Sequence, residues 1–166
     1  MRRIIRRREI VSDDWRYPGA APDAVTAAAG AHVVLALADF LAAAQAGALP
    51  AGGAGVQLEP PDEVEQLAPW LDRVALVVAH FPKNGEGRGF TQGQLLRRRY
   101  HYQGELRAAG AIKRDHLFHL ARCGFDSFDL DPAEDLAAAL AAFDSFTVGY
   151  QPASDLSVNL RARRIP

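Results

Sequence analysis

The sequence has little cysteine, little lysine and no long apolar run, and each shortage excludes a class of protein. A single cysteine cannot form an internal disulfide, and it excludes zinc and iron–sulfur sites built from several cysteines. No run approaches the ~20 consecutive apolar residues of a membrane-spanning helix. The basic start, residues 1–15, lacks the apolar segment of a secretory signal. We therefore expect a cytoplasmic protein that does not contact membranes.

The charge of the chain argues against nucleic acid as a partner. Its formal net charge is −1, so no overall field attracts it to an anionic surface. Of the 19 basic residues only Lys83 and Lys113 are lysines, which leaves 17 arginines. Several arginines lie within residues 2–8, where we expect a solvated basic edge strand. The alternative, an RNA-binding arm, lacks the aromatic residues on which bases stack.

The length and composition are those of one globular domain. A chain of 166 residues with 49% hydrophobic residues can bury a core without disulfides or metals. We expect a single domain over residues 1–166, with an N-terminal arm or edge strand at 1–20 and a C-terminal extension at 144–166. The extension is a candidate contact of a homo-oligomer.

Strands and helices alternate along the chain. The strand at 74–81 is the best defined, because it is a continuous apolar run of the kind that helices cover on both sides. Further strands are expected at 32–35, 56–59, 105–109 and 125–130. Short connections between alternating elements imply right-handed crossovers and a parallel sheet. The fold class is therefore α/β, with repeated βα units and a mostly parallel sheet. It forms either a partial TIM-barrel-like array or an open sheet with helices on both faces.

Helix boundaries follow from capping residues and from helical spacing. Thr91 and Gln94 form a capping-box pattern, which predicts a helix over 92–102. Asp131 followed by Pro132 and Glu134 predicts a helix that begins there and runs to about Phe143. The remaining helices are predicted at 36–45, from about Asp62 until Pro69 bends or ends it, and at 113–123.

Candidate anion-binding residues follow the strands at their carboxyl ends, where parallel sheets collect ligands. Lys83 and the loop that contains Gly87 and Arg88 come after strand 74–81, and Arg107 lies in the next strand. Together they predict a pocket for a small oxyanion, because guanidinium groups donate paired hydrogen bonds to such anions. The alternative is structural: Arg88 and Arg107 pair with nearby carboxylates and the glycines only permit a turn. The loop matches no nucleotide-binding motif.

Candidate catalytic residues are fewer. His80, at the end of strand 74–81, is the best-placed general base, and Asp115 is a possible acid or base. His116 and His119 have helical spacing but no third ligand, so we expect no metal site. Cys123 precedes Gly124 at a helix end, which destabilises a thiolate, so we expect a buried inert thiol. We also expect no bound cofactor.

Four segments resemble the signature of a bacterial family known as domain of unknown function 934. They are FPKNGEGRGFTQGQLLRRRY, GELRAAGAIKRDHLFHLARCGFDSF, the opening IIRRREIVSDDW and the late FTVGYQ. The matching positions are Phe81, Pro82, Lys83, Gly87, Arg88, Gly89, Gly104, Glu105, Leu106, Arg107, Gly110, Asp115, Arg122, Cys123, Gly124, Phe125 and Asp126. Histidines stand at 80, 116 and 119, where the family usually has other residues. The resemblance therefore supports Lys83, Arg88 and Arg107 more than a histidine mechanism.

The resemblance implies a link to sulfite reduction. Genes of this family typically lie beside those for ferredoxin-type sulfite or nitrite reductase, and members are often labelled probable oxidoreductases. The expectation is an accessory protein of assimilatory sulfite or sulfate reduction that binds a small oxyanion or a sulfite reductase. The alternatives are an enzyme acting on a small sulfur or phosphate compound, and a non-catalytic interaction module.

Overall fold

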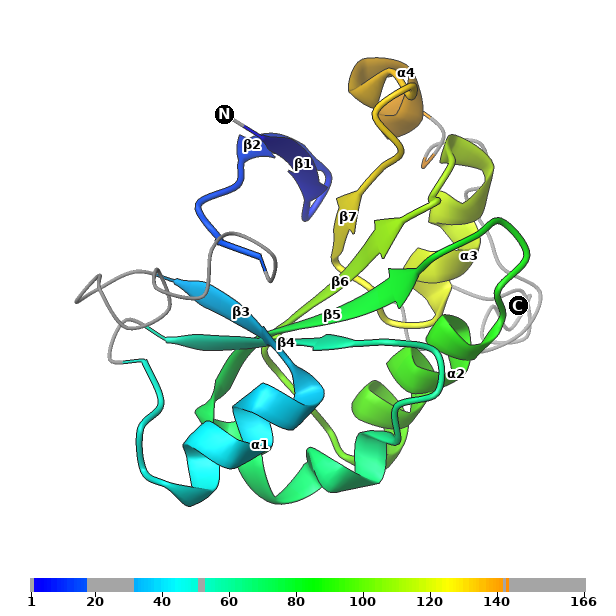
Figure 1. The fold of residues 1–166 in the computed structure, drawn as a ribbon. Coiled ribbons are helices and arrows are strands. Elements are labelled where there is room, and N and C mark those ends of the chain that lie inside the picture. Colours follow the sequence, from blue (N-terminus) through cyan, green and yellow to red (C-terminus); the bar gives the residue numbers. More distant parts are fainter. Residues whose placement is uncertain (1, 18–31, 51–52, 142, 144–166) are drawn as a thin grey trace, which may run out of the picture.

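The computed structural model describes residues 2–17, 32–50, 53–141 and 143, and its strands form one seven-stranded sheet (Figure 1). The order across the sheet is β2-β1-β7-β6-β5-β4-β3. The strands are β1 (Arg3–Arg6), β2 (Glu9–Ser12), β3 (Val33–Ala36), β4 (Ala54–Leu58), β5 (Val74–Phe81), β6 (Glu105–Gly110) and β7 (Ser127–Asp129). Each predicted strand is present, with boundaries that differ by a few residues. The predicted extension at 144–166 lies outside the described residues.

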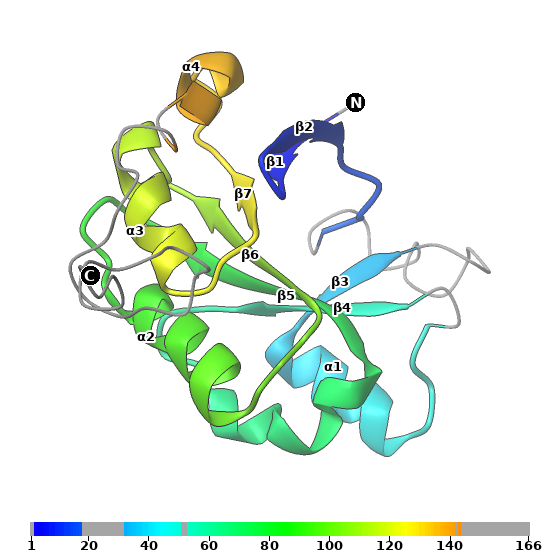
Figure 2. The same cartoon turned by 180° about the vertical axis from the view of Figure 1, so that it is seen from behind.

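The strands β3 to β7 are parallel and lie side by side in their order along the chain. Every crossover therefore moves in one direction, and right-handed crossovers then place the helices on one face. Figures 1 and 2 show α1 (Leu37–Gln45), α2 (Arg88–Gln94) and α3 (Leu117–Arg122) on the same side of the sheet. The α/β, mostly parallel fold is confirmed. The arrangement with helices on both faces is wrong, because this winding has no point at which the strand order reverses.

Different groups of side chains pack on the two faces of the sheet. On the helix side, Val77 and Phe81 of β5 join a large core with Phe40 of α1 and Leu120 of α3. The opposite side, which we call the helix-free face, carries a smaller apolar cluster. That cluster consists of Val34, Leu76, Val78 and Ala109, with the side chains of Trp15 and Tyr17 packed against it.

Residues 13–17 connect the two edges of the sheet. They follow β2 at one edge, and Arg16 forms a parallel bridge with Val33 of β3 at the other edge. The Trp15 ring lies over Gly55 of β4, where a Cβ atom would be 3.0 Å from the ring. The sheet is therefore curled toward a barrel, with the helix-free face on the inside. This closure agrees with the partial TIM-barrel-like prediction.

The N-terminal hairpin differs from its prediction in one respect. β1 pairs antiparallel with β2 and with β7, so it is an inner strand and β2 is the edge. Ile4 and Ile5, in the middle of β1, are fully buried between two exposed arginines. The predicted basic edge strand at residues 3–6 is thus inside the sheet, because these isoleucines need cover on both sides.

The helix at 88–99 begins earlier than predicted. It comprises α2 and a π-helical turn, η4 (Leu95–Arg99), and it starts at Arg88, so the capping box at Thr91 is wrong. Two glycines inside it allow close packing on aromatic rings. A Cβ atom at Gly89 or Gly93 would lie 2.4 Å from the ring of Phe81 or Phe125. The sequence pattern suggested a loop because glycine disfavours helix, whereas these glycines serve helix–sheet contact.

Three other predicted helices are shorter in the structure: those expected from Asp62, at 113–123 and from Asp131. Residues 62–73 form two 3₁₀ segments, η2 (Val64–Gln66) and η3 (Ala68–Arg73), and Pro69 stands at the start of the second. A third 3₁₀ segment, η5 (Arg114–His116), precedes α3. The last described helix, α4 (Leu136–Ala141), starts after Asp135, whose Oδ1 accepts a hydrogen bond from the Ala137 amide at 2.9 Å. The predicted start at Asp131 is therefore wrong by several residues.

None of the helices in the described part of the chain is long and apolar enough to cross a membrane.

Tyr102 makes the stability of the fold depend on pH at alkaline values. Its buried hydroxyl donates to the Val74 carbonyl oxygen at 3.1 Å. Burial raises the pKa of the Tyr102 phenol well above its ordinary value, although the Arg97 guanidinium opposes the shift. A pKa that is higher in the folded than in the unfolded state gives stability that is present below about pH 10 and is lost as the pH rises further.

We therefore expect the free energy of unfolding to fall from about pH 10 to about pH 11.5, and to fall less steeply in Tyr102→Phe. At pH 7 the same substitution should cost about 1 kcal/mol, through the lost hydrogen bond. Urea unfolding at several pH values measures both effects. If the free energy of unfolding fell equally steeply above about pH 10 in the native chain and in Tyr102→Phe, the prediction would be wrong.

Candidate functional site

A histidine–carboxylate pair lies at the carboxyl ends of β4 and β5. His80 is the penultimate residue of β5, and Glu59 directly follows β4. The distance from His80 Nδ1 to Glu59 Oε2 is 2.7 Å. The His80 side chain is 32% exposed and that of Glu59 is 44% exposed, so solvent reaches both. The structure thus gives the predicted base His80 a partner that the sequence did not identify.

Glu59 is held in place by several contacts. Gln57 Nε2 donates to Glu59 Oε1 at 2.7 Å, and the Glu59 amide donates to Asp62 Oδ2 at 2.8 Å. Gln92 Nε2 donates to the Glu59 carbonyl oxygen at 2.9 Å. Burial works to raise the pKa of the Glu59 carboxyl, but the hydrogen bonds from His80 and Gln57 outweigh it and the pKa is lowered. Glu59 is therefore a fixed, ionised partner of the imidazole.

Gly110, at the end of β6, borders the other edge of the His80 ring. A Cβ atom at Gly110 would lie 3.0 Å from His80 Cδ2 and 2.4 Å from the Phe81 carbonyl oxygen. Gly110 also has a φ of +109°, a conformation that other residues rarely adopt. The imidazole is thus placed between Glu59 on one side and bare backbone on the other.

The predicted anion-binding residues Lys83 and Gly87 lie in the loop after β5, and Arg88 is the first residue of α2. All three are exposed, and Lys83 and Arg88 form no ion pair with a described residue. A Cβ atom at Gly85 or Gly87 would meet nothing within 4 Å, so part of the loop backbone faces open space. Among the described residues, the Glu86 carboxylate accepts a hydrogen bond from the backbone amide of Arg88, at 3.1 Å, and forms no ion pair. The structure therefore leaves the charges of Lys83 and Arg88 available at the carboxyl edge.

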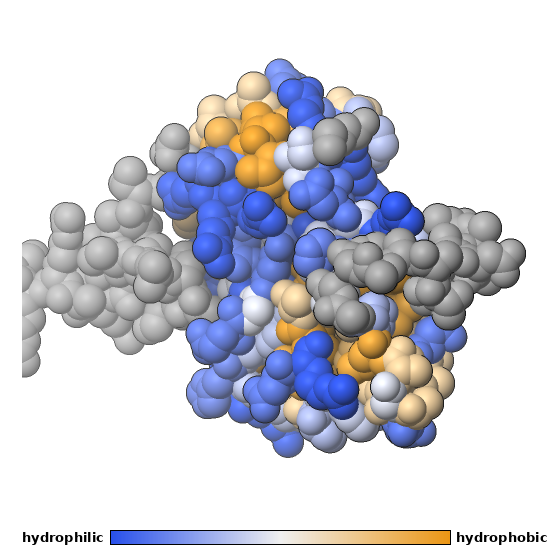
Figure 3. Space-filling model, turned by 90° about the vertical axis from the view of Figure 1, so that its left-hand side faces the viewer, coloured by the Kyte–Doolittle hydropathy of each residue, from blue (hydrophilic) through white to orange (hydrophobic). Residues whose placement is uncertain are grey.

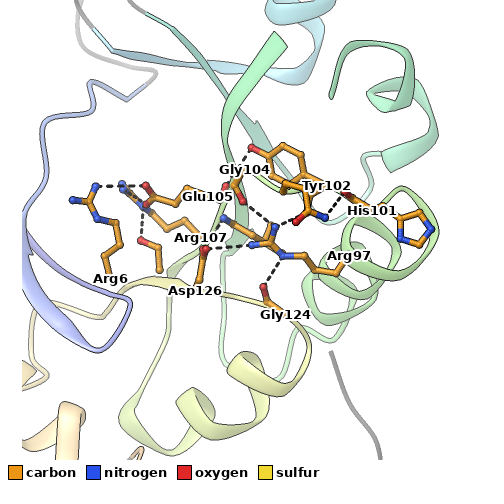
Figure 4. Close-up of polar contacts among 12 residues, drawn as sticks. Arg6, Arg97, His101, Tyr102, Gly104, Glu105, Arg107, Gly124 and Asp126 are labelled. Atoms are coloured by element: carbon orange, nitrogen blue, oxygen red, sulfur yellow. Dashed lines mark hydrogen bonds and ion pairs between the residues drawn. The ribbon is translucent and has the colours of Figure 1, made fainter. Parts of the chain in front are cut away.

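Arg107 does not reach that edge. It is fully buried in the middle of β6, on the helix-free face. Its guanidinium contacts Glu105 Oε1 at 2.6 Å (Figure 4). It also contacts Asp13 Oδ1 at 2.9 Å and the Tyr17 hydroxyl. Its Nε also donates to Ser127 Oγ at 3.1 Å. These contacts occupy every nitrogen of the Arg107 guanidinium. Arg107 therefore pairs with nearby carboxylates, as the structural alternative predicted, and it is not part of the predicted anion pocket.

A second ion pair on the helix-free face was not identified from the sequence. Both Nε and Nη2 of Arg2 donate to the carboxylate of Asp129, the last residue of β7, which is 4% exposed. The Arg2 guanidinium also lies 4.7 Å from the centre of the Tyr17 ring. Burial raises the pKa of the Tyr17 phenol, against the effect of the neighbouring Arg107. Arg2 and Asp129 are 127 positions apart, so no local sequence motif predicts their contact.

Arg97 organises the opposite, amino-terminal edge of the sheet. It extends from η4 and donates to the carbonyl oxygens of Tyr102 at 2.6 Å, Gly104 at 2.9 Å and Gly124 at 2.9 Å (Figure 4). Its Nη2 lies 3.3 Å from Asp126 Oδ2. Burial raises the pKa of the Asp126 carboxyl, against the hydrogen bond from the Leu106 amide. This network joins three segments and serves the fold.

The remaining candidates do not converge on His80. The carboxylate of Asp115 is 74% exposed and lies 3.9 Å from His116 of the same short helix. His119 packs on Phe90, with ring centres 4.9 Å apart. Cys123 is buried, as predicted, and its sulfur accepts a hydrogen bond from Gln94 Nε2 at 3.3 Å. Within the described residues there is no group of three or more potential metal ligands.

The interaction-module alternative predicts an exposed apolar patch, for which Trp70 and Tyr150 are the candidate residues. Trp70 is half-buried against the main core. Figure 3 views the side of the molecule on which β2 and β3 lie, and there hydrophilic side chains separate the visible apolar areas. Tyr150, the other residue considered for docking, lies outside the described residues.

The chain matches the model of a known protein family. The model of a bacterial protein family of unknown function (DUF934) matches residues 55–160. The chain belongs to this family. The match begins within β4 and runs past α4, so it includes His80, Lys83, Arg88 and both Arg97 and Arg107, but not the partners of Arg107 at residues 13 and 17. No protein with curated annotation matches the chain.

Proposed function

We propose that this DUF934 protein binds a small oxyanion at the carboxyl ends of β4 and β5, and that it serves sulfite or sulfate reduction. The observation that carries the proposal is a pair of exposed cations beyond the end of β5, Lys83 in the loop and Arg88 at the start of α2. Parallel α/β sheets bind their ligands at this end of the strands.

The electrostatics of the loop favour an anion. Other arginines have carboxylate partners, including Arg2, Arg6, Arg97 and Arg107. Lys83 and Arg88 have no such partner among the described residues, so an anion would not have to displace a carboxylate from them. The open backbone around Gly85 and Gly87 adds amide donors that a small anion can approach.

The choice of anion rests on the resemblance to proteins encoded beside sulfite reductases. Sulfite and sulfate are small oxyanions, and their size and charge suit two cations and backbone amides. Inorganic phosphate has a similar shape and tests whether the site distinguishes sulfur from phosphorus.

The proposal predicts that Arg88→Ala weakens the binding of sulfite and sulfate by about tenfold, the cost of one hydrogen bond to a charged group. Isothermal titration calorimetry measures this affinity, and the melting temperature should stay within about 1 °C of that of the native chain. Lys83→Ala should have a similar effect.

The matched control is Arg98→Ala, which removes an exposed arginine of η4, near the amino edge of the sheet. It should bind sulfite as the native chain does. Equal losses of binding and of stability in Arg88→Ala would assign Arg88 a structural role. Absence of sulfite, sulfate and phosphate binding by the native chain would reject the proposed function.

A further inference from the structure

The orientation of the His80 imidazole points to a role beyond attraction of an anion. Nδ1 faces the Glu59 carboxylate at 2.7 Å, and a carboxylate oxygen can only accept a hydrogen bond. Nδ1 therefore carries a proton, and in the neutral ring Nε2 holds the free lone pair. Most solvent-accessible histidines have no such constraint on their tautomer.

The position of Nε2 follows from the contact at Gly110. Cδ2, which is bonded to Nε2 in the ring, is the His80 atom nearest to a Cβ built on Gly110, at 3.0 Å. Nε2 therefore lies on the side of the ring away from Glu59, next to backbone that carries no side chain. No described residue forms a hydrogen bond with it. Since the side chain is 32% exposed, Nε2 is available to a ligand.

The charges around His80 suit an exchange of one proton with an anion. Glu59, directly after β4, is the charged group in contact with the ring, and it stays ionised because its pKa is lowered. The neighbouring residues of β6, Ala109 and Gly110, carry no charge. Lys83 follows three positions after His80 and adds positive charge to the edge.

We infer that His80 is a proton-transfer residue and that Glu59 is its positioning residue. The N–H bond at Nε2 of the imidazolium breaks, and an O–H bond forms on a small oxyanion of similar basicity, such as sulfite, at the carboxyl end of β5; the weaker base sulfate accepts only the hydrogen bond. The ring becomes neutral, Glu59 remains ionised, and solvent returns the proton. This inference rests on the proposed oxyanion site and adds the group that touches the ligand.

Sulfate is the probe for the test, because it stays fully ionised from pH 6 to pH 8 and any change in affinity then reports the protein. Histidine side chains ordinarily lose their proton near pH 6.5. We expect the native chain to bind sulfate about tenfold more tightly at pH 6 than at pH 8, through one charge-assisted hydrogen bond. In His80→Gln the affinity should be equal at the two pH values. The control is His101→Gln, which changes an exposed histidine near the amino edge and should keep the native profile.

The tautomer of His80 separates positioning from simple stabilisation. Nitrogen-15 spectra of the native protein at pH 8 should show the proton of the neutral ring on Nδ1. In Glu59→Gln, the proton should move toward Nε2, and the affinity difference between pH 6 and pH 8 should shrink. Unchanged spectra in that variant would overturn the role of Glu59.

Failure of this inference differs from failure of the proposed function. If sulfate binds in a manner that depends on Lys83 and Arg88, but equally at both pH values and in His80→Gln, the oxyanion site stands and proton transfer by His80 is rejected. If the native chain binds no sulfate at either pH, both proposals are rejected.

Discussion

Replacing Arg107 with alanine should destabilise the protein by roughly 3–5 kcal/mol, the usual effect of breaking a buried ion pair. The guanidinium of Arg107 is fully buried between Asp13 and Glu105. Without it, two carboxylates with little access to water would face one another. Asp13 is already incompletely satisfied, because its buried Oδ2 has no hydrogen-bond partner in the described part of the chain. For a chain of this length the loss corresponds to a fall in melting temperature of about 10 °C.

Arg6→Ala is the control for this prediction, because it removes a different partner of the same carboxylate. Arg6 lies 3.7 Å from Glu105 Oε2 and its side chain is 44% exposed. Exposed ion pairs contribute about 0–1 kcal/mol, so the melting temperature should fall little. If Arg107→Ala melted like Arg6→Ala, the buried network would not hold residues 13–17 across the helix-free face.

Replacing Arg97 with alanine should cost about 3 kcal/mol for a different reason. The substitution leaves three backbone carbonyl oxygens and the Asp126 carboxylate without their donor. Each lost hydrogen bond to a charged group costs about 1.5–3 kcal/mol, and water recovers part of that because Arg97 is partly exposed. Chemical unfolding of Arg97→Ala measures the loss.

Arg98→Ala is the neighbouring control, since Arg98 is exposed on the same π-helical turn. We expect its free energy of unfolding to lie within about 0.5 kcal/mol of that of the native chain. Similar losses in the two variants would mean that the turn depends on its total charge and not on the contacts of Arg97.

The strands were predictable because apolar runs and their spacing are local. β5 is continuous and buried on both faces, and β3, β4 and β6 follow the same rule. Helix starts were less predictable. The sequence predicts a loop through Gly89 and a helix only from residue 92, but the helix begins at Arg88, where the rings of Phe81 and Phe125 take the space that side chains at positions 89 and 93 would need. The rings come from elsewhere in the chain, so local propensity cannot anticipate them.

The candidate site was predicted in part. His80, Lys83 and Arg88 belong to one strand and its loop, and their placement at the carboxyl edge follows from the parallel sheet. Arg107 is an arginine like Arg88 and lies in the next strand along the chain, but its side chain points into the interior of the protein. Strand register decides this, and the sequence does not reveal which of two faces a polar residue in a buried strand will take.

By itself the sequence determined the α/β class, the parallel strands and the loop that holds the exposed cations, because each depends on neighbours along the chain. Only the tertiary structure decided that the sheet curls with its helices on one side. It also decided that Glu59 lies against His80 and that Asp13 and Glu105 enclose Arg107. Those contacts join residues from different strands, and their energies depend on burial, which arises only when the chain has folded.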